Sequence, residues 1–201
     1  MSRRHRRWHV GGVAVLAACV PLAAACGGAS GSEERSATTT TEAPSTTEPP
    51  APTTSLDPQA QALADAEAAY LAYEEAYNVA AADPVTPQHP ALQALITGDQ
   101  RIYLNSDLGG DLADGEALRH AQPSQYNVDV LSATPQSDGS ILLRVCQVDD
   151  RVVHKVATGE VVDDDVVTRT IDVRSINEGG TWKVALKTTV ADAPGVASCE
   201  G

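Results

Sequence analysis

The sequence predicts an α+β domain in which a long N-terminal amphipathic helix and short helices pack on the concave face of one curled antiparallel sheet of about four to six strands. Two observations support this class. Apolar residues recur every three or four positions between residues 57 and 108, the period of a helix, and every second position from residue 126 onward, the period of a strand. Helices followed by strands are typical of α+β domains.

The first predicted helix covers residues 57–82. Asp57 is a good N-cap acceptor and Pro58 suits the first helical position. The helix ends at Asp83-Pro84, because a residue before proline disfavours helical geometry. The apolar side, which is expected to pack on the sheet, carries Leu63, Ala66, Tyr70, Tyr73, Tyr77 and Ala80. Three acids are expected to face mostly away from it, namely Glu67, Glu74 and Glu75.

Two shorter helical segments and then the strands follow. Pro90 begins a short helix that ends or bends at Thr97-Gly98. Residues 99–108 form a third helical segment, which Gly109-Gly110 is expected to end. Alternating apolar residues then predict strands at 126–130, 141–148, 166–176 and 182–187, with a hairpin in 152–162.

The first 26 residues form a pattern of their own. Four arginines within residues 3–7 precede an uncharged stretch of 16 residues, 10–25, which ends in small residues and Cys26. A basic head, a short apolar body and a small-residue cleavage site make a secretory signal. The cysteine directly after that site makes the segment similar to a bacterial lipoprotein signal. This likeness implies that residues 1–25 are removed and that Cys26 is acylated with a palmitate-type chain.

Two cysteines compete for the lipid. Leu16 stands at the position that the lipoprotein pattern prefers relative to Cys19, whereas Leu22 stands one residue too early for Cys26. Cleavage before Cys19, however, leaves an apolar body of only about nine residues, near the short limit for a signal. The residues after Cys19 are still apolar, while those after Cys26 turn small and polar. Acylation of Cys26 is therefore favoured, with Cys19 as the alternative.

The charge and composition of the remaining chain limit its partners. Residues 26–56 predict a lipidated cysteine and a disordered tether, first Gly/Ser-rich and then Thr/Pro-rich, because almost nothing there can bury apolar area. Residues 57–201 then form one domain. Without the four arginines of the signal, 10 basic residues face 27 acidic ones, a formal charge of −17. Such a surface repels nucleic acid and anionic lipid head groups. We therefore expect attachment to the outer face of the cell membrane through the acyl chains alone.

Several short motifs occur in a recognisable order. A helix opened by residues 89–92 is followed by a strand in which Cys146 precedes Asp149-Asp150, then by segments 158–164 and 179–184 and the terminal Cys199. Together with the signal, the tether and the long first helix, these resemble the small NTF2-like lipoproteins of high-GC Gram-positive bacteria. The resemblance implies a cone-shaped, cystatin-like fold, a disulfide between Cys146 and Cys199, and mostly uncharacterised functions. It carries over no catalytic residue.

The disulfide also follows from the cysteine count. If Cys26 is acylated and Cys19 is removed, Cys146 and Cys199 are the two cysteines left in an exported domain, where disulfides form readily. The chain has no CxxC motif, so the bond is expected to be structural rather than catalytic.

Candidate ligand-binding residues lie on the first helix and the last strand. NTF2-like cones can hold a ligand between helix and sheet, so Tyr70, Tyr73, Tyr77 and Trp182 are candidates for lining such a pocket. The alternative is that they only fill the core. In an NTF2-like enzyme, an acid and a tyrosine would converge there, and the further candidates would be Tyr103, His120 and Asp172.

Other chemistry has little support in the sequence. The chain lacks a nucleophile elbow, a phosphate loop and a dinucleotide fingerprint. The spacing of Asn105, Asp107, Gly110, Leu112 and Glu116 fits a calcium loop in part, but Gly109 supplies no side-chain ligand at the fifth position. We therefore expect no cofactor, no metal and no enzymatic activity.

Three functional hypotheses remain. The first is a non-enzymatic surface lipoprotein that presents an NTF2-like domain for binding a protein or an envelope component. The second is a carrier of a small apolar ligand in the cone. The third and weakest is an isomerase- or cyclase-type enzyme of the NTF2-like class.

Overall fold

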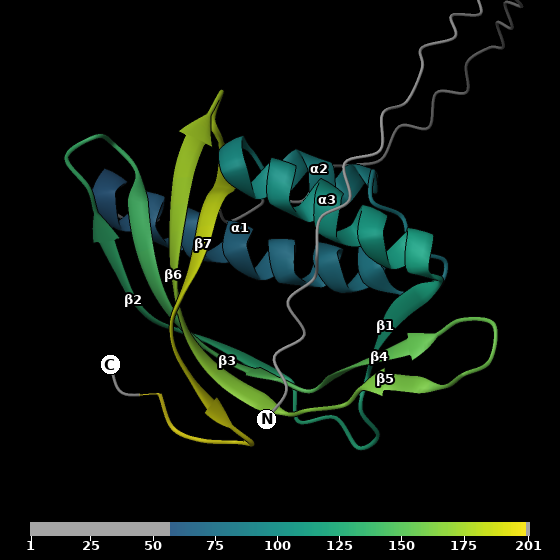
Figure 1. The fold of residues 1–201 in the computed structure, drawn as a ribbon. Helices are drawn as coiled ribbons and strands as arrows, with labels where there is room; N and C mark the ends of the chain where they lie inside the picture. Colours follow the sequence, from purple (N-terminus) through teal and green to yellow (C-terminus); the bar gives the residue numbers. More distant parts are fainter. Residues whose placement is uncertain (1–56, 200–201) are drawn as a thin grey trace, which may run out of the picture. The chain divides into compact units, whose positions relative to one another are not determined.

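Figure 1 shows the computed structural model of the chain, which describes residues 57–199. The predicted signal, Cys26 and the predicted tether lie outside the described residues. The described part has the predicted α+β class: three helices are followed by seven strands in two antiparallel sheets. None of the helices in this range is long and apolar enough to span a membrane.

Helix α1 covers Pro58–Ala81, within one residue of the predicted range. The Asp57 carboxylate caps it by accepting from the Gln59 backbone N–H at 3.4 Å. The tyrosine side packs inward as expected, since Tyr70 and Tyr73 are buried. The prediction for Glu74 was wrong, because its side chain is also buried. It follows Tyr70 by four residues, which places the two on the same side of the helix.

Helices α2 (Pro90–Leu95) and α3 (Gly98–Asp114) follow. The predicted end of α3 at Gly109-Gly110 was wrong, because the helix continues for another turn. A glycine inside a helix costs only about 1 kcal/mol, which the buried Leu104 and Leu108 offset. The end is set at Gly115, whose left-handed backbone (φ 65°) lets its N–H reach the carbonyls of Asp111 and Leu112.

The strands form two sheets, where one sheet of four to six strands was expected. The larger has the order β2 (Asn127–Pro135), β3 (Ile141–Asp149), β6 (Val167–Glu178) and β7 (Thr181–Pro194). The smaller has the order β1 (Glu116–His120), β4 (Arg151–Lys155) and β5 (Val161–Asp163). The chain passes between them at Asp150, whose buried carboxylate accepts from the Ser124 hydroxyl and from the backbone N–H groups of Gln125 and Tyr126 and so fixes the break.

Strand β1 was missed in the sequence because it is short and has one fully buried residue, Ala117. No apolar alternation marks it, so period alone gives no signal. Its partner β4 holds it in place over five paired positions, from Glu116 opposite Lys155 to His120 opposite Arg151. This strand therefore forms because it pairs with β4, and not because of a local sequence pattern.

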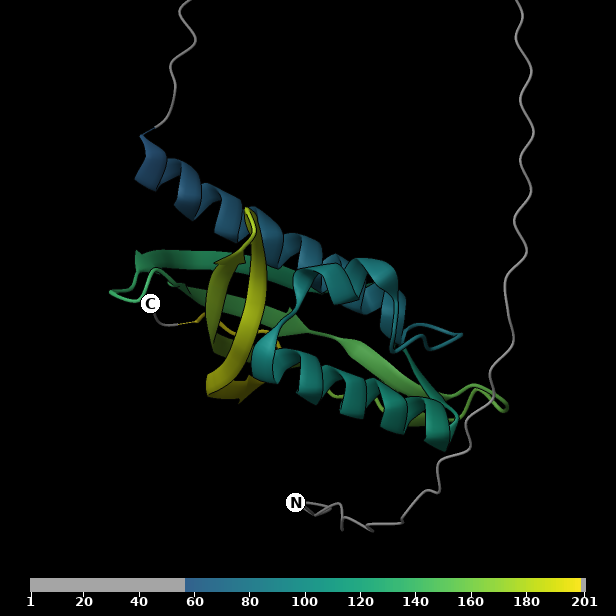
Figure 2. The same cartoon turned by 90° about the horizontal axis from the view of Figure 1, so that it is seen from above.

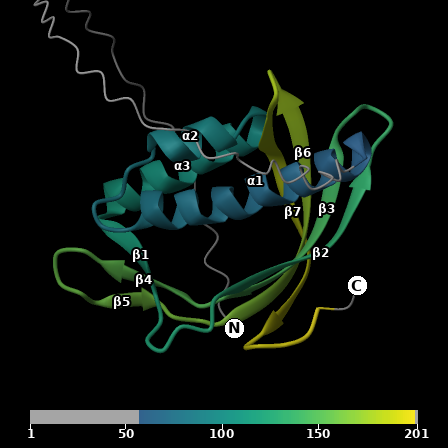
Figure 3. The same cartoon turned by 180° about the vertical axis from the view of Figure 1, so that it is seen from behind.

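The helices lie on one side of the larger sheet and enclose the core with it (Figures 1 and 2). The view from behind in Figure 3 shows the long strands β6 and β7 curving upward past α1. Register shifts in the β6–β7 pair fall between Thr170 and Ile171 and between Arg174 and Ser175. Such bulges bend strands and increase their twist, which accounts for the curl. An isolated parallel bridge from Ile96 to Val184 joins the end of α2 to β7.

The predicted disulfide is confirmed. Cys146 on β3 is bonded to Cys199, and their Cα atoms are 5.6 Å apart. The tail before Cys199 is also held by hydrogen bonds, since the Thr168 hydroxyl donates to the Gly195 carbonyl at 2.7 Å and accepts from the Ala197 N–H at 2.9 Å. The bond thus fastens the C-terminal tail to the larger sheet.

Candidate functional site

Glu74 lies at the centre of a buried polar cluster. It is 3% exposed, and its carboxylate accepts from the Tyr70 hydroxyl at 2.8 Å and the Tyr126 hydroxyl at 2.9 Å. The Gln147 amide donates to it at 3.0 Å, and the Lys187 ammonium forms a close ion pair with it. We call these five residues the Glu74 cluster. They come from α1, the loop before β2, β3 and β7, so the cluster ties the helix to the larger sheet.

The surroundings keep Glu74 ionised. Burial alone raises the pKa of a carboxyl group, but the charges of Lys187 and Arg151 and the hydrogen bonds outweigh burial and lower the pKa of Glu74 below its usual 4.5. Burial and the Glu74 charge raise the pKa of the Tyr70 hydroxyl, so it stays protonated as a donor. An ionised, fully hydrogen-bonded carboxylate is a weak proton acceptor. Glu74 is therefore suited to holding the fold rather than to general-base catalysis.

Arg151 extends the cluster from the smaller sheet. Its Nη1 is 4.0 Å from the Glu74 carboxylate and donates to the Asn78 side-chain carbonyl at 3.2 Å. Its Nε and Nη2 bind Asp149 at 2.7 and 2.9 Å, a bidentate pair. The guanidinium also lies over the Tyr77 ring at 4.9 Å. These contacts fix Arg151 firmly in one position.

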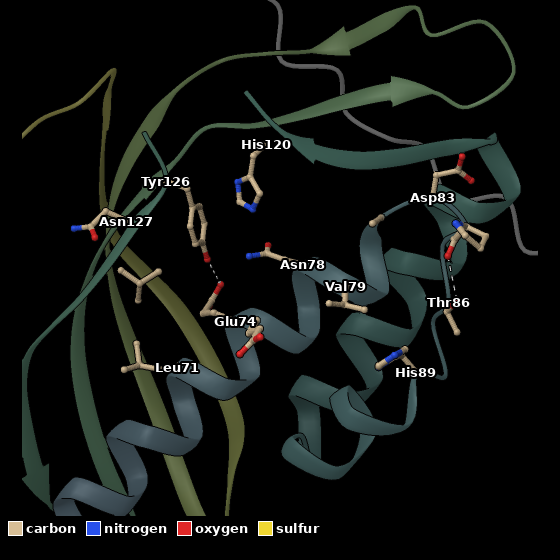
Figure 4. A pocket seen from close by; sticks show the side chains of 14 residues that line it. Leu71, Glu74, Asn78, Val79, Asp83, Thr86, His89, His120, Tyr126 and Asn127 are labelled. Carbon is tan, nitrogen blue, oxygen red and sulfur yellow. Dashed lines mark hydrogen bonds between the residues drawn. The ribbon is translucent and has the colours of Figure 1, made fainter. Parts of the chain in front are cut away.

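The first of two cavities beside the cluster is a groove of about 860 Å³ along α1. Figure 4 shows it from close by. We call it the α1 groove. One stripe of α1 forms its floor, and its walls are the α1–α2 loop, His120 and the start of β2. The stripe residues are Leu71, Glu74, Glu75, Asn78 and Val79, and Ala82 lines the groove directly after the helix. This face of α1 adjoins the tyrosine side that packs into the core, and Glu74 lies between the two.

One wall of the groove is polar. His120 Nδ1 lies 3.2 Å from the buried Asp150 carboxylate, and the His120 ring packs edge-on against Tyr126 with centroids 4.8 Å apart. Figure 4 shows His120 and Tyr126 near Asn78, with Leu71 and Val79 on either side of Asn78 along the helix. The groove thus combines apolar side chains on α1 with a polar wall.

The second cavity, of about 320 Å³, lies between α1, α3 and the strands. We call it the inner cavity. Three tyrosines, Tyr73, Tyr77 and Tyr103, contribute to its walls. Three cations also line it, namely Arg151, Arg169 and Lys187. Charged side chains therefore form part of its walls, in contrast to the wholly apolar pocket that the carrier hypothesis expects.

The structure places the predicted site residues in different surroundings. Tyr73 and Tyr77 line the inner cavity, whereas Tyr70 belongs to the Glu74 cluster. Trp182 packs against the core from β7 and lines neither cavity. Asp172 pairs with Arg144 between β3 and β6, at 3.2 Å for Nη2 to Oδ2.

The remaining catalytic candidates are also kept apart. Tyr103 lines the inner cavity and His120 lines the α1 groove, so these two do not converge with Asp172. The residues that the sequence analysis missed are Glu74, Gln147, Arg151 and Lys187. The sequence contained one indication of Glu74. It follows Tyr70, a predicted buried tyrosine, by four residues, so the two side chains lie on the same side of the helix.

The partial calcium pattern does not form a loop. Asn105, Asp107, Gly110 and Leu112 belong to the continuous helix α3, and Glu116 begins β1. Side chains on a continuous helix cannot wrap around one ion as the EF-hand ligands do. Among residues 57–199, no group of three or more His, Cys, Asp or Glu side chains is arranged to hold a metal.

Comparisons with known proteins give little guidance. No protein-family profile matches the sequence, and no curated protein matches it either. Among solved structures, the intermembrane space region of the chloroplast protein ARC6 has a TM-score of 0.49 and 14% identity, covering 64% of this chain and 96% of that chain. The function must therefore be argued from the residues themselves.

Proposed function

We propose that this chain is a non-enzymatic, membrane-anchored extracytoplasmic lipoprotein with an NTF2-like domain, and that the α1 groove of that domain binds a segment of a partner protein. The observation that carries the proposal is the outward stripe of α1. Leu71 and Val79 are 43% and 54% exposed although they lie inside a packed helix, and both border a cavity of about 860 Å³. Exposed apolar residues that line a cavity are typical of interaction sites.

The charges around the groove indicate the partner's chemistry. Glu75 on α1 and Asp83 in the following loop both line the groove and are exposed. The expected charge of the mature chain is strongly negative. A segment with an apolar side chain flanked by lysine or arginine therefore complements the groove best. A tether of some 30 residues, with its end in the membrane, gives the domain reach toward such a partner.

The fold supports the NTF2-like part of the proposal at a general level. Helices lie on one side of a curled four-stranded antiparallel sheet, and a disulfide joins the predicted cysteines. The carrier alternative relies on the inner cavity, whose charged walls suit a polar ligand better than an apolar one. The enzyme alternative has one feature in its favour, His120 held by Asp150 in the polar wall of the groove. Glu74, the most deeply buried acid of the groove, is saturated with hydrogen bonds and unsuited to proton transfer.

The anchor is tested by replacing each candidate cysteine. Cys26→Ala is expected to abolish incorporation of radiolabelled palmitate and to shift the protein out of the washed membrane fraction, because a single signal cysteine carries the acyl chains. Cys19→Ala, the matched control, is expected to leave both unchanged. The reverse result would assign the anchor to Cys19. Membrane retention in both variants would remove the lipoprotein part of the proposal.

The groove is tested by photo-crosslinking in intact cells. A photoreactive amino acid at Val79 or at Leu71 of the full-length chain is expected to give the same protein adduct. Its cross-linked peptide should carry an apolar residue flanked by lysine or arginine. Val162 on β5 is the matched control, because it is 49% exposed against 54% for Val79 and lies outside the groove.

Charge reversal then links the adduct to the groove rim. Glu75→Lys with Asp83→Lys is expected to reduce adduct formation from Val79 at least fivefold, whereas Asp65→Lys near the start of α1 should have little effect. The proposal fails if Val162 gives the same adduct, or if the adduct is unaffected by charge reversal. An adduct with glycan or lipid would assign the groove to an envelope component instead of a protein.

A further inference from the structure

We propose that the inner cavity binds a small zwitterion of the amino-acid class, with its carboxylate at the cationic wall formed by β4, β6 and β7 and its ammonium group at the acidic side formed by α3. This site is distinct from the α1 groove and does not depend on the function proposed for it.

The cationic wall has more positive than negative charge. Arg151 and Arg169 share one carboxylate, Asp149, and Lys187 is paired with Glu74. Three cations therefore face two carboxylates. The Arg169 side chain is 32% exposed, against 12% for Arg151, and Asp149 is its one side-chain partner among residues 57–199. Arg169 thus has N–H donors left for a ligand.

Hydroxyl groups add further donors to the same cavity. Tyr77, Tyr103 and Thr189 line it, and each of these side chains carries a hydroxyl group that can donate a hydrogen bond. Tyr77 is fixed in place by the stacked Arg151 guanidinium and by ring contact with Tyr73, with centroids 6.5 Å apart. Fixed hydroxyls beside an arginine with spare N–H groups form a donor-rich wall, which a carboxylate satisfies best.

The side formed by α3 carries the opposite charge. Asp99 lines the cavity four residues before Tyr103, so the two lie on one stripe of the helix. Its carboxylate would repel a ligand that carried negative charge alone. A ligand that also carries an ammonium group complements both walls, and this dipolar arrangement identifies a zwitterion.

The remaining walls limit the ligand's size and side chain. Leu104, Ile171 and Leu186 supply apolar surface beside the tyrosine rings. The volume of about 320 Å³ is at the lower end of the range for ligand pockets, roughly 300–1,000 Å³. A free amino acid with a small or medium apolar side chain fits these limits.

Calorimetric titration of the full-length lipidated protein in detergent tests the proposal with three matched probes. L-Leucine carries both charges, 4-methylpentanoate lacks the ammonium group, and 3-methylbutylamine lacks the carboxylate. We expect leucine to bind at least tenfold more tightly than either analogue. L-Serine and L-phenylalanine extend the set to other side chains. If none of the three amino acids binds, or if the acid or the amine binds as well as leucine, the proposal is overturned.

Variants assign the charges to residues. Arg169→Gln is expected to weaken leucine binding at least tenfold, while Arg174→Gln, at an exposed position of the same strand, leaves it unchanged. Asp99→Asn is expected to remove most of the preference for leucine over 4-methylpentanoate, and Asp65→Asn is its control. Melting curves of each variant verify folding. Equal leucine affinity in Arg169→Gln and Arg174→Gln would contradict the assignment of the carboxylate to Arg169. These binding results are independent of the cross-linking test at the α1 groove.

Discussion

Replacing Glu74 with glutamine is expected to lower the free energy of unfolding by roughly 3–5 kcal/mol, the usual cost of removing one partner from a buried ion pair. The substitution keeps the side chain's shape but leaves the Lys187 ammonium without its counter-charge. The Glu74 carboxylate accepts from four donors, whereas the glutamine amide has one oxygen and one NH2 group. That NH2 group is itself a donor and would face the donors Tyr70, Tyr126 or Gln147. Urea denaturation followed by circular dichroism measures the change.

Glu75→Gln is the matched control, because the neighbouring residue is exposed and is expected to change stability by less than about 0.5 kcal/mol. A second variant separates ion pairing from packing. Glu74→Leu with Lys187→Met removes both charges and is expected to be more stable than Glu74→Gln, since apolar replacements of whole buried pairs are often tolerated. If Glu74→Gln and Glu75→Gln had the same stability, the cluster would not support the fold.

The stabilisation that Glu74 provides is expected to be lost at acidic pH. The pKa of Glu74 is lower in the folded chain than its usual 4.5, so the unfolded chain takes up the proton first. The stabilisation is therefore complete above about pH 4.5 and is lost as the pH falls through the folded-state pKa. Glu74→Gln should lack this part of the acid transition, so the stability gap between the two proteins should narrow below pH 4.5.

Removing the disulfide by replacing Cys146 and Cys199 with serine is expected to cost about 4 kcal/mol, because the bond closes a loop across a sequence separation of 53 residues. For a domain of this size, that loss lowers the melting temperature by roughly 10 °C or more. Scanning calorimetry with and without reductant measures it. The reduced wild-type protein is expected to melt together with the double variant, whereas the variant itself should not respond to reductant.

Removing the disulfide is also expected to loosen the C-terminal tail more than the rest of the domain. Without the bond, Gly195 and Ala197 are held to β6 mainly by hydrogen bonds with Val166 and Thr168. Their backbone amides are expected to exchange with solvent faster, while amides in the middle of β3 and β6 retain most of their protection. An unchanged melting temperature on reduction would show that the disulfide adds nothing to stability.

The sequence was sufficient for features that depend on neighbouring residues. The Asp57 cap and the buried tyrosines of α1 follow from local rules of capping and period, and the pairing of Cys146 with Cys199 follows from a count of cysteines. The signal pattern and its two candidate lipid sites are also purely local. These features were available before any fold was known, because each depends on spacing along the chain.

Other features depend on residues that the sequence keeps far apart. Glu74 and Lys187 are 113 positions apart, so no local pattern could reveal that a glutamate expected on the outer face of a helix is buried as an ion pair. The division into two sheets likewise depends on Asp150, whose partners His120 and Ser124 are 30 and 26 positions away. The same reason explains why the cations that line the inner cavity were missed.

The sequence by itself therefore determined the α+β class, the first helix and the cysteine pairing. Export stays a prediction from the first 26 residues. Only the tertiary structure decided which acid is buried, where the chain changes sheets, and which charges face each cavity. The physical reason is that helix period and capping depend on interactions between residues a few positions apart, while the cysteine pairing follows from the number of cysteines left in the domain. Burial of a charge is decided by partners that folding brings together from distant segments.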